Sequence, residues 1–350
     1  MKAMMKQCIG KALINIANSW PTSKGFLKSL GMRATVRLFS PRRAVSVQTP
    51  NGQTLKLTHV SSNYLSLQLF WKGTSYYEPL TTLAVQELLH PGSTFVDVGA
   101  NIGFFSLTAS LTKLGIEVIA FEPNPKNYAI LKENIRANGF ENIHCEPLAV
   151  SDRAGTAKFY LNTSDMSASL LPNFQRAFNP ASNCVEVQTT TLDDYFDKHF
   201  FRNRSVWKID VEGHETVLLQ GARRMLATHA PDLIIEVLQP YPEETSTMLK
   251  ELGYEFYHIN ELGLVRSEKL HFERRGDFCF LNYLISKRPE AEVSHISEKI
   301  AARAKQIDFR QTSKYFGPQI KPFESVTAWM PPFVTLAAKS EELLYEWPRF

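Results

Sequence analysis

A carboxylate stands two residues before a glycine-rich turn in the segment Phe95 to Gly103. The apolar residues before the turn are typical of a buried parallel strand, and Gly99 and Gly103 let the chain turn sharply and approach a ligand closely. The spacing Asp-x-Gly-x-x-x-Gly lacks the three glycines of a dinucleotide fingerprint. Asp97 would repel a pyrophosphate and attract a cationic sulfonium or amine. The segment favours S-adenosylmethionine over a dinucleotide, and a tight turn without a ligand is the alternative.

Two further carboxylates follow the next two predicted strands. Glu122 stands roughly twenty residues after the turn, where an acid can accept hydrogen bonds from both ribose hydroxyls. Its alternative role is that of an acid favoured by the dipole of the helix that begins at Pro125. Asp152 can accept a hydrogen bond from an adenine amino group, or it can serve as a turn residue before Gly155.

A charged cluster ends the predicted strand at 205–211. Its titratable members are Lys208, Asp210, Glu212, His214 and Glu215. In open α/β sheets, ligands bind beyond the carboxyl ends of the strands, so we expect these side chains near Asp97. A solvated helix start would explain Glu215 but not charged residues on the strand itself.

Strands and helices alternate around these motifs, which predicts a doubly wound, mostly parallel α/β sheet. The predicted strands are 93–98, 116–121, 142–148, 205–211, 232–238, 254–259 and 278–286, with β-like stretches at 157–161 and 185–190. The predicted helices are 81–89, 102–113, 125–138, 214–226 and 242–252. The polar excursion at 162–182 is long for a connection and is a candidate lid or substrate loop.

The two ends of the chain differ from this central part. Residues 1–30 resemble short helices, and 44–47 and 54–58 read as a hairpin across Asn51-Gly52. After residue 286 we expect a helix at 294–305 and an aromatic, proline-rich tail that packs on the body or on a second subunit. We therefore expect a helical and β-hairpin cap at 1–75, a catalytic domain at 76–286 and an extension at 287–350.

Composition restricts the protein class. The chain has 350 residues, 44% of them hydrophobic, which is ample for a buried core. Its four cysteines are widely separated, so we expect neither a disulfide framework nor a zinc site, and a reducing, cytoplasmic location. The first 77 residues hold 11 Lys or Arg and no acid, which suits an arm on anionic lipid or polyanion, a transit peptide or a basic cap. No apolar run reaches the roughly 20 residues that span a bilayer.

Four motifs in order resemble the FkbM-type methyltransferase family, over roughly residues 76–240. They are Phe-Val-Asp-Val-Gly-Ala-Asn-Ile-Gly at 95–103, Phe-Glu-Pro at 121–123, Ala-Val-Ser-Asp at 149–152 and Lys-Ile-Asp-Val-Glu-Gly-His-Glu at 208–215. The resemblance implies a Rossmann-like, seven-stranded fold that uses S-adenosylmethionine. The acceptor it implies is a hydroxyl of a sugar, glycolipid, polysaccharide or polyketide.

The resemblance also implies roles for individual residues. Asp97, Gly99, Asn101 and Gly103 would hold the methionine part, Glu122 the ribose and Asp152 the adenine, while Glu78 belongs to an upstream motif that could close over the cofactor. The expected cofactor-binding residues are Glu78, Asp97, Gly99, Ala100, Asn101, Gly103, Glu122, Asp152 and Asp210.

The expected chemistry is alignment of an acceptor hydroxyl with the methyl group and removal of its proton. His214 is the candidate base, because a helix N-terminus would lower its pKa and keep the imidazole neutral. Asp210 and Glu212 are the alternatives: they could take the proton, orient His214 or hold a divalent ion, although their spacing matches no metal motif and we assign no metal ligand.

Two other functions stay open. An RNA methyltransferase would use the basic first 77 residues. Base-amino methylation would need an Asn- or Asp-Pro-Pro-aromatic segment after the fourth strand, where this chain has Asp210-Val211-Glu212, and Pro331-Pro332 lies far away in the tail. No cysteine follows a proline, as cytosine methylation would need, so we do not expect nucleic acid as partner. A non-catalytic methyltransferase-like scaffold at a membrane surface is the second alternative. The expected partners are a small-molecule or glycan acceptor, and a second copy of the chain.

Overall fold

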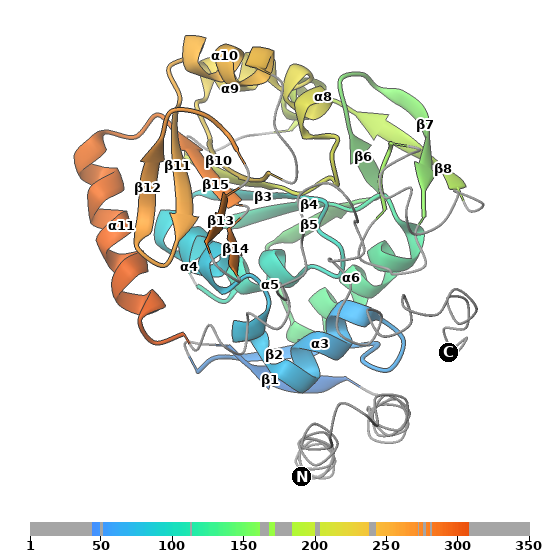
Figure 1. The fold of residues 1–350 in the computed structure, drawn as a ribbon. Coiled ribbons are helices and arrows are strands. Elements are labelled where there is room, and N and C mark those ends of the chain that lie inside the picture. The colour runs from blue at the N-terminus through green and yellow to red at the C-terminus, as the bar shows by residue number, and fades with distance from the viewer. Residues whose placement is uncertain are drawn as a thin grey trace, which may run out of the picture. The chain divides into compact units, whose positions relative to one another are not determined.

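The computed structural model describes residues 44–49, 52–112, 114–161, 168–171, 184–199, 204–237, 243–271, 273–275, 278–280 and 282–307 (Figure 1). These residues fall into two compact units, one up to Tyr77 and one from Glu78 onward. The predicted short helices at 1–30, the aromatic tail and most of the excursion at 162–182 lie outside the described residues.

The first unit contains the predicted hairpin. Strand β1 (Val45–Gln48) pairs antiparallel with β2 (Thr54–Leu57), which confirms the small N-terminal sheet, although Asn51 of the predicted turn lies outside the described residues. Helix α3 (Tyr64–Lys72) was not predicted; it begins at Asn63, whose side chain accepts a hydrogen bond from the amide of Ser66. A 3₁₀ turn (Thr74–Tyr76) ends the unit.

The second unit is built on a central sheet that, among the described residues, has eight strands in the order β12-β11-β15-β10-β9-β3-β4-β5. The bounds are β3 (Thr94–Val98), β4 (Glu117–Phe121), β5 (Ile143–Glu146), β9 (Ser205–Ile209), β10 (Asp232–Glu236), β11 (Glu255–Asn260), β12 (Gly263–Ser267) and β15 (Asn282–Ser286). Neighbours from β5 to β10 run parallel, and β15 is antiparallel to both β10 and β11. The predicted doubly wound, mostly parallel fold is confirmed. The strand β12 extends the seven predicted strands by one, since it forms a hairpin with β11.

The predicted strand at 142–148 is divided between two sheets. Its first part is β5, and β6 (Leu148–Val150) instead joins β8 (Cys184–Thr190) and β7 (Gly155–Tyr160) in a three-stranded sheet. Pro147 lies at the division, where it has no amide hydrogen for a sheet hydrogen bond. The smaller sheet therefore positions Asp152, which follows β6.

The helices lie between the strands as the alternation predicts. Their bounds in this unit are α4 (Pro79–Leu88), α5 (Phe104–Ser110), α6 (Pro125–Asn138), α7 (Leu192–Lys198), α8 (Glu215–Gln220), α9 (Arg223–Thr228), α10 (Glu243–Glu251) and α11 (Glu290–Ala304). Helix α6 has the predicted bounds, and the Asn124 side chain accepts from the amide of Lys126. The predicted helix at 214–226 is two helices, and α7 was not predicted.

Two predicted elements break at identifiable places. Helices α8 and α9 separate at Gly221, where a Cβ atom would lie 2.2 Å from the carbonyl oxygen of Ser151. The predicted strand at 278–286 is β14 (Phe278–Phe280) followed by β15, and β14 pairs with β13 (Glu273–Arg275) in a separate hairpin.

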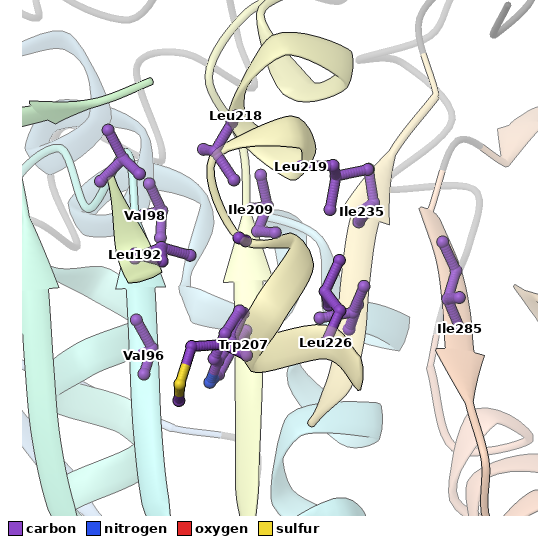
Figure 2. Close-up of a cluster of buried hydrophobic side chains, with 14 of the residues drawn as sticks. Val96, Val98, Leu192, Trp207, Ile209, Leu218, Leu219, Leu226, Ile235 and Ile285 are labelled. Atoms are coloured by element: carbon purple, nitrogen blue, oxygen red, sulfur yellow. The ribbon is translucent and has the colours of Figure 1, made fainter. Parts of the chain in front are cut away.

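A hydrophobic core fixes the end of β9 against α8 and α9 (Figure 2). The side chains of Trp207 and Ile209 are fully buried in it, and the ring of Trp207 stacks on that of Phe196 with centroids 5.8 Å apart. Burial of each large apolar side chain contributes about 1.5–3 kcal/mol to stability. Because side chains alternate along a strand, Lys208 lies on the opposite face of β9, with its Nζ atom 4.5 Å from the centre of the Phe105 ring.

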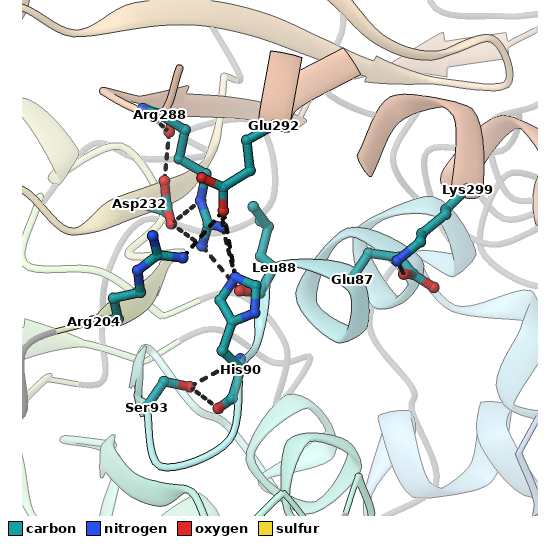
Figure 3. Close-up of polar contacts among 10 residues, drawn as sticks. Glu87, Leu88, His90, Ser93, Arg204, Asp232, Arg288, Glu292 and Lys299 are labelled. Atoms are coloured by element: carbon teal, nitrogen blue, oxygen red, sulfur yellow. Dashed lines mark hydrogen bonds and ion pairs between the residues drawn. The ribbon is translucent and has the colours of Figure 1, made fainter. Parts of the chain in front are cut away.

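A polar cluster holds the other end of the same sheet (Figure 3). The guanidinium of Arg288 lies 2.6 Å from the carboxylate of Asp232, the first residue of β10, and donates to the carbonyl oxygen of Leu88 at 3.0 Å. Its Nη1 atom also bonds Glu292 and lies 2.8 Å from Nε2 of His90. Burial and the adjacent Arg288 lower the pKa of His90. This cluster connects α4, β10 and α11.

Candidate functional site

The glycine turn lies against the backbone of the neighbouring strand. Gly99 has a φ of +82°, and a Cβ atom on it would lie 1.9 Å from the carbonyl oxygen of Asp210. The amides of Gly99 and Ala100 both donate to the carbonyl oxygen of Phe121, and the amide of Asp210 donates to that of Val98. The turn is therefore fixed between the carboxyl ends of β3, β4 and β9.

The carboxylate of Asp97 is buried at the centre of this edge. Its Oδ2 atom accepts from the amide of Ser106 at 3.0 Å and from the Ser106 hydroxyl at 2.6 Å, which ties β3 to the first turn of α5. Its Oδ1 atom accepts no hydrogen bond from the described residues. Burial raises the pKa of Asp97, while Lys208 opposes that shift.

Glu122 lies beside the turn and binds its backbone. Oε2 accepts from the amide of Asn101 at 2.7 Å, and Oε1 accepts from the amide of Asn124 at 2.8 Å. Asn101 has a φ of +52°, so the turn bends toward the carboxylate at a left-handed residue. Burial raises the pKa of Glu122 to about 7, although both amide hydrogen bonds oppose the shift. Two lone-pair positions on each carboxylate oxygen leave capacity for further donors.

Lys208 and Asp210 form a buried ion pair beside Asp97. The Nζ atom of Lys208 lies 2.8 Å from Oδ2 of Asp210. Burial alone would lower the pKa of Lys208, but the carboxylates of Asp210, Glu78 and Asp97 raise it above its usual range. Lys208 is thus a permanent cation among several acids, and it reduces their mutual repulsion.

Three more carboxylates lie close enough to this ion pair to interact with it: Glu78, Glu212 and Glu236. Burial raises the pKa of Glu212 well above its usual range, and Asp210 and Glu215 raise it further. Burial and Asp210 do the same for Glu236. Glu78 has a φ of +40° and accepts from the side-chain amide of Asn282 at 3.3 Å.

Glu236 was not predicted as a site residue. It is the last residue of β10, which runs parallel to β9 with Ile235 opposite Ile209. The rule that places Asp210 at the ligand-binding edge therefore applies to Glu236 too. That signal was present in the sequence.

The turn after β9 is held from two sides. Glu212 has a φ of +55°, and its carbonyl oxygen accepts from the hydroxyl of Ser169 at 2.9 Å, so a described part of the excursion contacts this turn. Glu215 is buried and accepts from the amides of Val211 and Gly213. Burial raises the pKa of Glu215 to about 7.

His214 contacts Ser151, which in turn contacts Asp152. It forms no hydrogen bond with the acids around the Lys208–Asp210 ion pair among the described residues. Its Nε2 atom is 3.0 Å from the hydroxyl of Ser151, which in turn donates to Oδ1 of Asp152 at 3.1 Å. The pKa of His214 is lowered as expected, but the main cause is burial. The side-chain contacts with Asp210 or Glu212 that would orient it are not found among the described residues.

The predicted residues therefore form two groups. One surrounds the glycine turn: Glu78, Asp97, Gly99, Ala100, Asn101, Gly103, Glu122, Asp210 and Glu212, to which the structure adds Lys208 and Glu236. The other is His214 with Asp152, joined through Ser151. Across the described residues, no three His, Cys, Asp or Glu side chains are arranged to hold a metal ion.

Comparisons with known proteins point to one family. The model of the methyltransferase FkbM domain matches residues 97–256. The chain is 42% identical over 81 residues to the 31-O-demethyl-FK506 methyltransferase FkbM of Streptomyces tacrolimicus, a match that covers 23% of this chain and 31% of that protein. It is 24% identical over 197 residues to the methyltransferase sdnD of Sordaria araneosa, covering 47% of this chain and 75% of the relative.

Solved structures give weaker similarity. A methyltransferase FkbM from Methylobacillus flagellatus matches with a TM-score of 0.36 and 17% identity, covering 57% of this chain and 44% of that one. The chain thus spans about a third of the length of the first curated relative and less than half of this structure. In the described part of the chain, no helix is long and apolar enough to cross a bilayer.

Proposed function

Residues 97–256 belong to the FkbM methyltransferase domain family, and on that basis we propose that the protein is an S-adenosylmethionine-dependent O-methyltransferase. The observation that carries the proposal is the bond between the glycine turn and Glu122, in which the amide of Asn101 donates to Oε2 at 2.7 Å. This bond holds two features at one edge of the sheet: a glycine turn whose backbone a ligand can approach closely, and a carboxylate that can accept hydrogen bonds from ribose hydroxyls. A nucleoside ligand requires both.

The donor and acceptor set suits S-adenosylmethionine. The acids around the turn give a negative potential that favours a sulfonium and an ammonium group. Gly99, Ala100, Asn101 and Gly103 would provide the backbone surface, with Asp97 and Asp210 beside the methionine part. Glu122 would accept the ribose hydroxyls, and Asp152 would accept the adenine amino group. When bound, S-adenosylmethionine would supply an electrophilic methyl group.

The chain's own residues must align the acceptor hydroxyl and take its proton. We propose that Glu212 is the base that takes this proton and that Asp210 lies beside it. Burial and adjacent acids raise the pKa of Glu212, and a raised pKa makes a carboxylate a stronger base. His214 suits this role less well, because its Nε2 is occupied by Ser151 and its Nδ1 is buried.

The acceptor class comes from the family and from the first relative, whose name describes methylation of a natural product. We propose a hydroxyl of a sugar, glycolipid, polysaccharide or related natural product. Ser169 supports an acceptor role for the excursion, because it bonds the backbone of Glu212. Two further proposals rest on the sequence alone. They are contact of the basic first 77 residues with anionic lipid, and the formation of a homodimer.

The test is incubation of the purified chain with S-adenosylmethionine labelled at the methyl carbon and with fractionated cell material. We expect label in a lipid, glycan or small-molecule fraction, with alkali-stable ether linkage, and much less label with Glu212→Gln. Label in RNA would replace this acceptor class by nucleic acid. Absence of label from every fraction, with cofactor binding intact, would favour the non-catalytic scaffold.

A further inference from the structure

The hydroxyl of Ser151 connects two side chains that are far apart in the sequence. It lies 3.1 Å from Oδ1 of Asp152 and 3.0 Å from Nε2 of His214, and both Ser151 and His214 are buried. A hydroxyl carries one proton, so Ser151 can donate to only one of these partners.

The chemistry of the partners decides the direction. An ionised carboxylate can only accept, and its charge makes the bond stronger than one between neutral groups. Ser151 therefore donates to Asp152, and the Nε2 hydrogen of His214 donates to Ser151. The other ring nitrogen, Nδ1, is then an unprotonated acceptor that is buried and has no hydrogen-bond partner among the described residues.

The backbone of Ser151 is itself fixed. Its amide donates to the carbonyl oxygen of Thr190, and its own carbonyl oxygen lies so close to Gly221 that a Cβ there would be 2.2 Å away. We call the two hydrogen bonds from His214 to Ser151 and from Ser151 to Asp152 the relay. Its middle residue, Ser151, has a fixed backbone, and its last atom is Oδ1 of Asp152, which also accepts from Nε of Arg153. The side chains of Ser151 and Arg153 thus both contact Oδ1, and neither contacts Oδ2.

We propose that His214 and Ser151 are positioning residues that orient Asp152 so that Oδ2, the oxygen that neither Ser151 nor Arg153 contacts, accepts the exocyclic amino group of adenine. The inference rests on the proposed function, because it assumes that the site binds an adenosyl ligand. The relay then discriminates between purines, since a purine with an amino group at position 6 is bound and one with a carbonyl oxygen there meets a carboxylate that cannot donate. In this proposal His214 helps to determine which purine binds, and it does not accept the proton of the acceptor hydroxyl.

Calorimetry with two ligands tests this without knowledge of the acceptor. S-adenosylhomocysteine carries the amino group, and S-inosylhomocysteine carries a carbonyl oxygen in its place. Ser151→Ala and His214→Leu should each weaken S-adenosylhomocysteine binding by about three- to tenfold, the typical net worth of one hydrogen bond, and change S-inosylhomocysteine binding much less. Ser151→Thr and His214→Gln, which retain a hydroxyl or an equivalent donor, should restore most of the preference. His144→Leu, an exposed histidine change on β5, should bind both ligands as the wild type does.

A double-mutant cycle separates positioning from mere support of the fold. In an Asp152→Ala background, His214→Leu should have no further effect on the preference between the two ligands, because the relay would have nothing to orient. An equal loss for both ligands, or an undiminished effect in that background, would overturn the proposal. So would a His214→Leu variant that binds both ligands normally and only transfers methyl slowly, since that result assigns His214 to proton removal. If the folded wild type bound neither ligand, the proposed function itself would fail.

Discussion

The carbonyl oxygen of Asp210 occupies the space in which Gly99 would carry a side chain, 1.9 Å from an ideal Cβ position. The glycine turn and the end of β9 are thus in backbone contact. This contact joins the turn that we propose for the cofactor to the strand end that carries Asp210, so a side chain at Gly99 would have to displace backbone.

We predict that Gly99→Ala abolishes binding of S-adenosylhomocysteine. The added methyl group must displace backbone, and the positive φ adds about 1–2 kcal/mol of strain. Gly115→Ala is the matched control: Gly115 also has a positive φ, +63°, but no atom lies within 4 Å of its Cβ position. Gly115→Ala should therefore lose only the cost of the positive φ, about 1–2 kcal/mol in urea unfolding, and retain full ligand affinity. Equal binding by the two variants would contradict the backbone contact.

For Asp97 we predict separate effects of charge and of helix anchoring. Asp97→Asn keeps the shape of the side chain and a carbonyl oxygen for Ser106, but it removes the negative charge, so affinity for the cationic S-adenosylmethionine should fall more than affinity for neutral-sulfur S-adenosylhomocysteine. Ser106→Ala removes the 2.6 Å hydroxyl bond and should cost about 1–3 kcal/mol in unfolding free energy without that ligand difference. Equal losses for both ligands in Asp97→Asn would argue against a charge role.

The raised pKa of Glu122, about 7 because of burial, predicts pH-dependent binding. Ribose hydroxyls donate best to the ionised carboxylate, so affinity for S-adenosylhomocysteine should be level above pH 7 and fall by up to about tenfold per pH unit below it. Glu122→Gln should flatten this profile. The effect on folding stability has the opposite sign. Because the pKa of Glu122 is higher in the folded than in the unfolded chain, this carboxyl stabilises the fold most at pH values below its ordinary pKa, and the stabilisation is lost as the pH rises to about 7.

Glu215 provides the control for that pH profile, because its pKa is also raised to about 7 by burial. It accepts backbone amides of the turn after β9 and is not among the expected cofactor ligands. Glu215→Gln should leave the pH dependence of binding unchanged. If Glu215→Gln flattened the profile and Glu122→Gln did not, the ribose assignment would be wrong.

At the opposite end of the sheet we predict an effect on stability alone. Arg288→Met would leave the buried carboxylate of Asp232 without its guanidinium partner, at a cost of about 3–5 kcal/mol (Figure 3). Urea unfolding measures that loss, and calorimetry on the folded fraction should give unchanged affinity for S-adenosylhomocysteine. Arg224→Met, at an exposed ion pair with Asp197, should cost at most about 1 kcal/mol.

The elements whose signals are local were predictable from the sequence. Helix α6 begins at Pro125 after Asn124 as its cap residues indicate, and strand β3 and the glycine turn follow directly from their residue types. The carboxylates 97, 122 and 210 were found by the rule that ligands bind where parallel strands end. Glu236 obeys the same rule and was missed only because its strand carries no second charged residue at that end.

Relationships between distant segments were not predictable. The transfer of β6 to a smaller sheet depends on pairing with β8, some forty residues later, and the break between α8 and α9 depends on the approach of Gly221 to Ser151. The bond between Ser151 and His214 spans 63 positions in the chain. No local pattern carries this information, since it arises from tertiary packing.

The edge formed by the glycine turn, Glu122 and the ion-pair acids is the site that we propose for S-adenosylmethionine. Calorimetric titration of the folded chain with S-adenosylhomocysteine at pH 8 tests this assignment, with thermal unfolding of the same samples as a check of folding. We predict saturable binding of one ligand per chain, retained by Gly115→Ala and lost in Gly99→Ala. A folded wild-type protein that gives no binding heat and no thermal stabilisation by the ligand would contradict it.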